Sequence, residues 1–202
     1  MNILTKAFPE QEHEILSNLN TLDDFQLSQK WDNEPYRYRY LLTIYFRHHE
    51  LLNVIEKNPE LQHAIHNNYQ DLWFFIFDQL LLVLPAQQHN LSNALEILTK
   101  EFLSQMTIDS ESSDVNNLTE EQIRSVPLEY FVSQALEKLY PLERLIILGK
   151  DKFSWSDEKI CDYLEQHQKC SVTRSEINTY YMQGHSHLIN VLPSDIVTIY
   201  LN

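Results

Sequence analysis

The residue types that could hold a metal ion occur twice in this sequence at the spacing Glu-x-x-His. Glu10 and His13 form the first pair, and Glu60 and His63 form the second. In helical di-iron proteins this motif needs two further inward-facing glutamates on long helices. The first pair lies on a short segment and the second directly follows Pro59. We therefore expect solvent-exposed side chains at these positions and no metal site.

The remaining histidines and the cysteines form no recognisable catalytic group. His63 and His66 share a helical face, but no third ligand lies nearby in the sequence. Cys161 falls within a predicted helix, where it is expected to pack as a small apolar side chain. Together with Cys170 it indicates two reduced thiols rather than a disulfide framework. We predict that the protein is not an enzyme and uses neither a cofactor nor a small-molecule substrate.

Glycine is scarce, since Gly149 and Gly184 are the only two in 202 residues. Phosphate-binding loops and dinucleotide-binding turns need glycine where the backbone approaches a ligand or adopts positive φ, and β-hairpins need it in tight turns. The composition therefore favours an all-α fold. The longest apolar stretch, 72–85, is interrupted by Asp78 and is too short to span a bilayer. Because no signal peptide is evident either, we expect a cytoplasmic protein without a membrane segment.

Helical periodicity and helix-start signals divide the chain into two blocks. The polar segment 109–117 lacks an apolar stripe, which is typical of a linker. We predict an N-terminal helical domain over 1–106, a linker over 107–118 and a C-terminal domain over 119–202. Predicted helices before the linker cover 10–19, 20–31, 36–55, 60–84 and 91–106. After it, helices are predicted to start at Thr119, Pro127, Pro141, Ser156 and Thr173, the first and last with capping-box spacing.

A family resemblance rests on the segment 139–164. Leu139 and Pro141 open it, Arg144 follows three residues on, and the Ser-x-Glu-x-Ile run at 156–160 leads to Leu164. This segment resembles region 4 of bacterial sigma-70 factors, in particular of the extracytoplasmic-function type, which has a similar size and domain layout. The resemblance implies that the second domain is a helix-turn-helix bundle whose recognition helix covers 173–190.

A second similarity concerns the first block. The segments 36–46 and 63–80 resemble region 2 of the same family, whose second helix docks on the clamp of RNA polymerase. The resemblance places a polymerase-binding surface at Asn68, Gln70, Asp71 and Trp73.

The predicted recognition helix has few basic residues. Arg174 is the one Lys or Arg from Ser171 to the end of the chain, and the formal net charge of the protein is −14. Because DNA binding needs cations for phosphates and guanine edges, we expect weak DNA contact. The expected contacts are Thr173, Arg174, Ser175, Asn178, Thr179 and Tyr180.

The sequence thus predicts a sigma-70-like transcription protein that binds core RNA polymerase and contacts promoter DNA weakly. The alternative is a sigma-derived adaptor or regulator that has lost DNA binding and acts on a protein partner. The basic-poor recognition helix motivates this alternative, and both remain open from the sequence.

Overall fold

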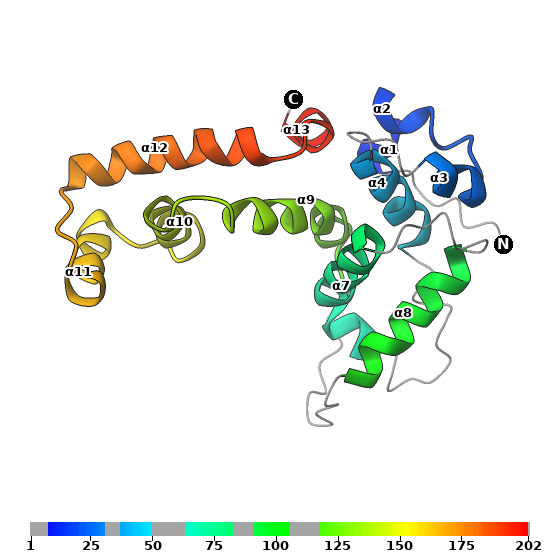
Figure 1. Ribbon diagram of the computed structural model, residues 1–202, viewed down its shortest axis with the longest axis horizontal. Helices are drawn as coiled ribbons and strands as arrows, with labels where there is room; N and C mark the ends of the chain where they lie inside the picture. Colours follow the sequence, from blue (N-terminus) through cyan, green and yellow to red (C-terminus); the bar gives the residue numbers. More distant parts are fainter. Residues whose placement is uncertain (1–7, 31–36, 50–63, 83–90, 106–117, 202) are drawn as a thin grey trace. The chain divides into compact units, whose positions relative to one another are not determined.

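The computed structural model describes residues 8–30, 37–49, 64–82, 91–105 and 118–201 (Figure 1). All regular structure within these ranges is helical, and they contain no strand, which confirms the all-α prediction. Contacts divide the chain into two compact units. Unit 1 consists of Met1–Glu129 with Thr198–Asn202, and unit 2 of Tyr130–Val197. Each unit is described by itself below.

In unit 1 the first three described helices are short and the later ones are longer. The predicted helix over 10–19 is two helices, because His13 adopts extended backbone angles and its Nδ1 accepts a hydrogen bond from the Ile15 amide at 3.2 Å. The helices are α1 (Pro9–Glu12), α2 (Glu14–Ser17), α3 (Asp24–Lys30), α4 (Arg37–His48), α7 (Tyr69–Leu82), α8 (Leu91–Gln105) and the first part of α9 (Glu120–Leu136).

Aromatic side chains from α4 and α7 form the centre of unit 1. Tyr45, Trp73 and Phe77 are fully buried, and the Tyr45 and Trp73 rings meet edge to face with centroids 4.7 Å apart. Such pairs add to the free energy gained by burying aromatic surface. Apolar residues recur at helical spacing through this part of the chain, and the described ones are all buried: Ile65, Tyr69, Leu72, Trp73, Ile76, Phe77 and Leu80.

Helices α3 and α4 are joined by a charged cluster. The Asp24 carboxylate lies 2.5 Å from Arg47 Nη1 and 3.0 Å from His48 Nε2. The hydrogen bond with His48, followed by that from Arg47, lowers the pKa of Asp24 despite its partial burial. In α4, therefore, buried tyrosines face the core while Arg47 pairs with an acidic residue.

Helix α9 corrects one predicted helix start. Its first turn has the predicted capping box, in which Gln122 N donates to Thr119 Oγ1 and Thr119 N donates to Gln122 Oε1. Pro127, however, lies inside this helix instead of opening a new one. Proline supplies no amide hydrogen to the carbonyl four residues earlier, that of Ile123. The buried Tyr45 hydroxyl donates to this carbonyl at 2.5 Å, which accounts for a proline in the helix interior.

Unit 2 is built from short helices around one apolar cluster. Ile146, Ile160, Leu164 and Ile177 have no exposed surface, and they join three helices to one another. Gly184 allows close packing, since a Cβ there would lie 2.8 Å from Ile147 Cδ1. The elements are the last part of α9, α10 (Pro141–Ile147), the π-helical turn η2 (Leu148–Lys152), α11 (Asp157–Gln168), α12 (Arg174–Val191) and the start of α13 (Ser194–Leu201).

The division of the chain differs from the predicted domain boundary. The sequence placed it at residues 118 and 119, whereas the compact units divide between Glu129 and Tyr130, within α9. All but the last residue of the predicted linker lies outside the described residues. Over the part of the chain that the structure describes, no helix combines the length and the apolar character needed to cross a membrane.

Candidate functional site

Helix α11 starts and ends at identifiable signals. Ser156 has extended backbone angles, and its hydroxyl accepts a hydrogen bond from the Lys159 amide, as the sequence predicted. The helix extends to Gln168, which leaves residues 169–173 between α11 and α12. Lys169 adopts the left-handed conformation with φ of 51°, and the Cys170 amide donates to the Leu164 carbonyl at 3.2 Å. This pairing is typical of a helix C-terminus.

Helix α12 begins with the capping box that its sequence predicts. The Glu176 amide donates to Thr173 Oγ1 at 3.3 Å, and the Thr173 amide donates to Glu176 Oε2 at 2.8 Å. The hydrogen bond from the Thr173 amide lowers the pKa of Glu176. Thr173 and Glu176 therefore both help to start the helix, and the first turn of α12 is held in one geometry.

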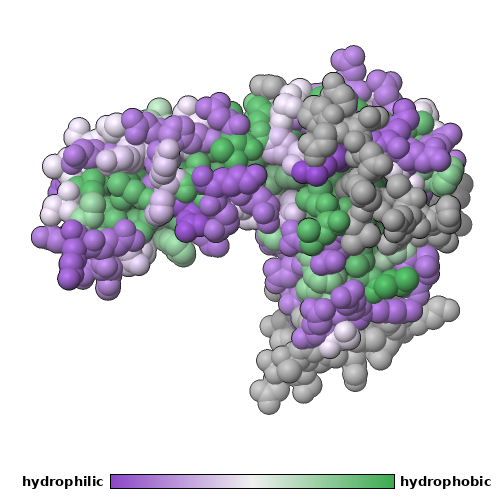
Figure 2. All heavy atoms as spheres, viewed as in Figure 1, coloured by the Kyte–Doolittle hydropathy of each residue, from purple (hydrophilic) through white to green (hydrophobic). Residues whose placement is uncertain are grey.

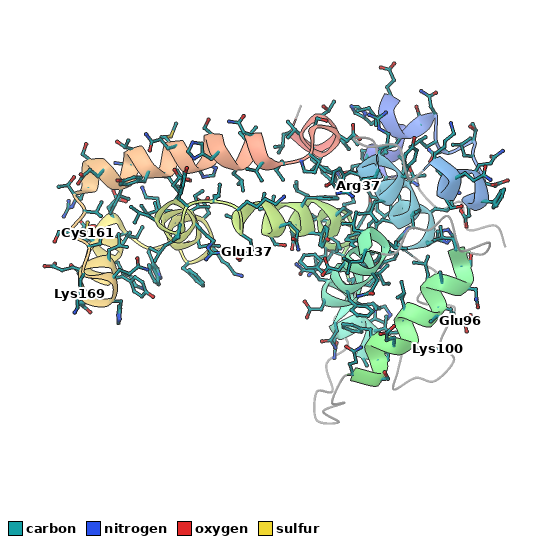
Figure 3. The ribbon with its side chains drawn as sticks, viewed as in Figure 1. Arg37, Glu96, Lys100, Glu137, Cys161 and Lys169 are labelled. Carbon is teal, nitrogen blue, oxygen red and sulfur yellow. The ribbon has the colours of Figure 1, made fainter. Side chains whose placement is uncertain are left out.

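Side-chain packing holds α11 against the start of α12. Ile160 and Leu164 on α11 meet Ile177 on α12 in the core of unit 2. Cys161 Sγ donates to the Val172 carbonyl at 3.1 Å, and Figure 3 labels this cysteine near the start of α11 and Lys169 at its end. Helices α11 and α12 are thus packed together through a short connecting segment, and the start of α12 remains exposed.

Most of the six predicted DNA-contacting residues lie on this exposed start. Thr173, Arg174, Ser175, Asn178 and Thr179 are exposed, whereas Tyr180 is half-buried against the core. Arg174 Nη2 lies 2.5 Å from Glu158 Oε1, and Asn178 Oδ1 accepts a hydrogen bond from Lys150 Nζ at 2.9 Å. Thr179 Oγ1 donates to the Ser175 carbonyl at 3.0 Å. These residues therefore lie mostly at the surface, where their polar groups largely have partners within the protein.

The π-helical turn η2 contributes residues that the sequence analysis did not predict. Lys150 Nζ lies 2.9 Å from Asp157 Oδ1 and 4.9 Å from the centroid of the Tyr181 ring. Asp151 Oδ1 accepts a hydrogen bond from the Tyr181 hydroxyl at 2.7 Å, which raises the pKa of Tyr181. His185 Nε2 lies 3.1 Å from the other Asp151 oxygen. The turn therefore fixes α12 by contacts with Tyr181 and His185, which stand four residues apart on one face.

A hollow of about 250 Å³ lies beside this turn, between α10 and α11. Aromatic side chains supply much of its wall, with Phe153 half-exposed. The Arg144 guanidinium lies at the same hollow and pairs with Glu137, the residue that follows α9. In Figure 2, hydrophilic residues cover the C-terminal end of α11. The apolar lining consists of Pro141, Leu145, Leu148, Phe153, Trp155 and Tyr163.

The four residues of the predicted polymerase-binding surface differ in their exposure to solvent. Gln70 and Asp71 are exposed, and Gln70 Nε2 donates to Glu129 Oε2 at 2.7 Å. Asn68 is half-buried, and its side-chain amide donates to the Ala64 carbonyl. Trp73 corrects the prediction, because its side chain is 0% exposed and packs inside unit 1. It belongs to the aromatic core and cannot contact a partner at the surface.

The first Glu-x-x-His pair has structural roles, and Glu10 corrects the prediction of solvent-exposed side chains because its carboxylate is buried against Arg124. Arg124 donates three hydrogen bonds of 2.8–3.2 Å to the Glu10 carboxylate, and His13 caps α2. Of the second pair, Glu60 and His63 lie outside the described residues. Within the described ranges, no group of three candidate metal ligands occurs.

Comparison with known proteins gives this chain no family. No protein-family model, curated protein or solved structure matches it. Its function is therefore inferred from the chemistry of α7, α11 and α12.

Proposed function

We propose that this protein is a divergent sigma-70-like transcription protein that binds core RNA polymerase and contacts promoter DNA weakly. The proposal rests on one observation, the exposed and capped start of the 18-residue helix α12 packed across α11. In helix-turn-helix proteins the second helix enters the major groove, and residues near its N-terminus contact base edges. The resemblance of the segment 139–164 to sigma region 4 supports the same arrangement.

The charges near α12 support weak rather than tight DNA contact. Phosphate contacts by Lys and Arg supply most of the affinity of proteins for DNA. Arg174 is the one Lys or Arg of α12, and it pairs with Glu158. Lys150 is also close to α12, but its side chain is only 20% exposed and lies beside Asp157. Neither cation meets a phosphate without first leaving an internal partner.

The exposed start of α7 supports the polymerase-binding part of the proposal. Gln70 and Asp71 lie at the surface, whereas the aromatic core beneath them fixes the helix. A rigid helix that presents polar side chains is suited to docking on another protein. Because Trp73 is buried, the proposed polymerase-binding surface consists of Asn68, Gln70 and Asp71.

The ion pair between Arg174 and Glu158 also favours a second candidate function. If the pair stays closed, unit 2 offers little positive charge to a polyanion, and the protein acts on a protein partner as an adaptor or regulator. This alternative keeps the sigma-like fold without promoter reading. The two candidates differ in whether duplex DNA binds at all.

Co-purification of the full chain with core RNA polymerase tests the first proposal. We expect polymerase to be retained at low salt and to be lost when Asp71→Lys reverses an exposed charge on α7. Glu101→Lys on α8, another exposed acidic residue of unit 1, is the matched control and should retain polymerase. No retention by the unchanged protein at low salt would contradict the proposal.

Fluorescence anisotropy with a short labelled duplex separates the two candidates. Measurements at about 50 mM and about 200 mM salt reveal phosphate contacts as a steep fall in affinity. Specific binding that falls steeply with salt and collapses with Arg174→Ala would exclude the adaptor. Polymerase retention without any duplex binding would favour it.

A further inference from the structure

The guanidinium of Arg174 is already bound to an anion in this structure. Its Nη2 atom lies 2.5 Å from Glu158 Oε1, and the two side chains are 66% and 53% exposed. A DNA phosphate would use the same donor atoms in the same geometry as this carboxylate. Glu158 and a phosphate therefore compete for one cation.

Glu158 is held in position for this competition by the start of α11. It lies in the first turn of the helix, where unpaired amides and the helix dipole favour a negative charge. Its own backbone amide, then Arg174 and the Ser156 hydroxyl, lower the pKa of Glu158. At neutral pH the carboxylate is ionised, and it both occupies Arg174 and repels an approaching phosphate.

Arg174 is the cation on which this competition has its largest effect. Lys150 is mostly buried and has Asp157 and Asn178 as partners, so it is less accessible to DNA. All other lysines and arginines of unit 2 precede Arg174 in the sequence, and residues 175–197 contain none. The affinity of α12 for a duplex therefore depends strongly on the state of one side chain.

We propose that Glu158 is an intramolecular competitor for DNA, whose ion pair with Arg174 suppresses duplex binding by the start of α12. This inference rests on the DNA-facing role of α12 in the proposed function. It assigns the weakness of DNA contact to one residue of α11 in addition to the net charge of the chain. Removing the carboxylate should strengthen binding, although it adds no new contact group to the protein.

The test compares two substitutions that change net charge equally. Glu158→Gln frees Arg174, whereas Glu165→Gln removes an exposed charge elsewhere on α11. Duplex affinity of the full chain is measured by fluorescence anisotropy at several salt concentrations. We expect Glu158→Gln to bind about two- to fivefold more tightly than Glu165→Gln, which is the range that exposed ion pairs contribute. The affinity of the Glu158→Gln protein should also fall more steeply with salt concentration, by the amount that about one further phosphate contact contributes.

Substitution of Arg174 tests whether the tighter duplex binding of the Glu158→Gln protein depends on this residue. In an Arg174→Gln background, Glu158→Gln should bind no better than Glu165→Gln. Thermal melting followed by circular dichroism checks that each variant is folded. Glu158→Ala is a second way to remove the carboxylate, since alanine favours the helix.

The outcomes separate this inference from the proposed function. Equal affinity of the Glu158→Gln and Glu165→Gln proteins would overturn it, because net charge alone would explain the result. No duplex binding by any variant at about 50 mM salt would overturn it as well. Polymerase retention in that second case would still support the sigma-like proposal. A gain with Glu158→Gln that disappears in the Arg174→Gln background would support the inference whether or not polymerase is retained.

Discussion

The proline inside α9 gives a prediction that joins two distant parts of unit 1. Pro127 provides no amide hydrogen to the Ile123 carbonyl, and the buried Tyr45 hydroxyl donates to that carbonyl at 2.5 Å. Burial, followed by the nearby Tyr69 hydroxyl, raises the pKa of Tyr45, so the hydroxyl stays protonated and able to donate. Tyr45→Phe removes this donor without removing the aromatic ring. The Ile123 carbonyl then loses the donor that replaces the missing helix bond.

The expected cost follows from the hydrogen bond that is lost. Ile123 is half-buried, so leaving its carbonyl without a partner should cost about 1–2 kcal/mol in the free energy of unfolding, the lower part of the range for a buried acceptor. Pro127→Ala restores an amide donor at the position where the helix would normally supply it. In that background Tyr45→Phe should cost less by about 1–2 kcal/mol, which is a typical coupling energy for groups that share one partner. Effects of Pro127→Ala on helix propensity and packing cancel in this comparison.

Urea unfolding of the four proteins, followed by far-ultraviolet circular dichroism, measures the coupling. Tyr163→Phe removes a tyrosine hydroxyl from α11 in unit 2 and should show no coupling to Pro127→Ala. If Tyr45→Phe costs the same in both backgrounds, to within about 0.5 kcal/mol, the hydroxyl does not compensate for the proline. In that case the Ile123 carbonyl does not depend on the Tyr45 hydroxyl for the stability of α9.

Three further perturbations test other contacts by the same unfolding measurement. Asp24→Asn should lower the free energy of unfolding by about 2 kcal/mol at neutral pH. This loss should persist above the ordinary Asp pKa of 3.8 and should shrink as the pH falls through the lowered pKa of Asp24 in the folded state. Arg124→Ala should cost about 3 kcal/mol because it leaves the buried Glu10 unpaired, whereas Lys100→Ala, from an exposed pair labelled in Figure 3, should cost less than about 0.5 kcal/mol. Gly184→Val should cost about 1–3 kcal/mol by overpacking, since even a Cβ there would lie 2.8 Å from the nearest side-chain atom of α10; no loss of stability would contradict this packing.

Local signals in the sequence were sufficient to predict several helix starts. Thr119, Ser156 and Thr173 each form the capping hydrogen bonds that their spacing predicts. These interactions involve residues at most three positions apart, so they depend little on the rest of the fold. The buried stripe of α7 was predictable for a similar reason, because helical periodicity alone places Trp73 and its neighbours on one face. The same periodicity argued against Trp73 as a surface residue.

Interactions between distant residues could not be predicted in this way. The interior position of Pro127 depends on Tyr45, which contributes its hydroxyl from another helix. The partner of Arg174 is 16 residues earlier, and the two meet because the core of unit 2 packs α11 against α12. The sequence therefore predicted which polar residues would lie at the start of α12, but not that they would already have partners.

The charge of the protein is concentrated in unit 1, and this changes how its net charge bears on DNA binding. Residues 130–197 contain 9 acidic and 7 basic side chains, whereas the rest of the chain contains 20 and 8. Long-range repulsion of a polyanion therefore comes mainly from unit 1, whose acidic composition is better suited to a basic protein partner. Unit 2 is close to neutral, so under the proposed function short-range pairing would decide whether α12 binds a phosphate. The Glu158–Arg174 ion pair is the contact that we propose controls this binding.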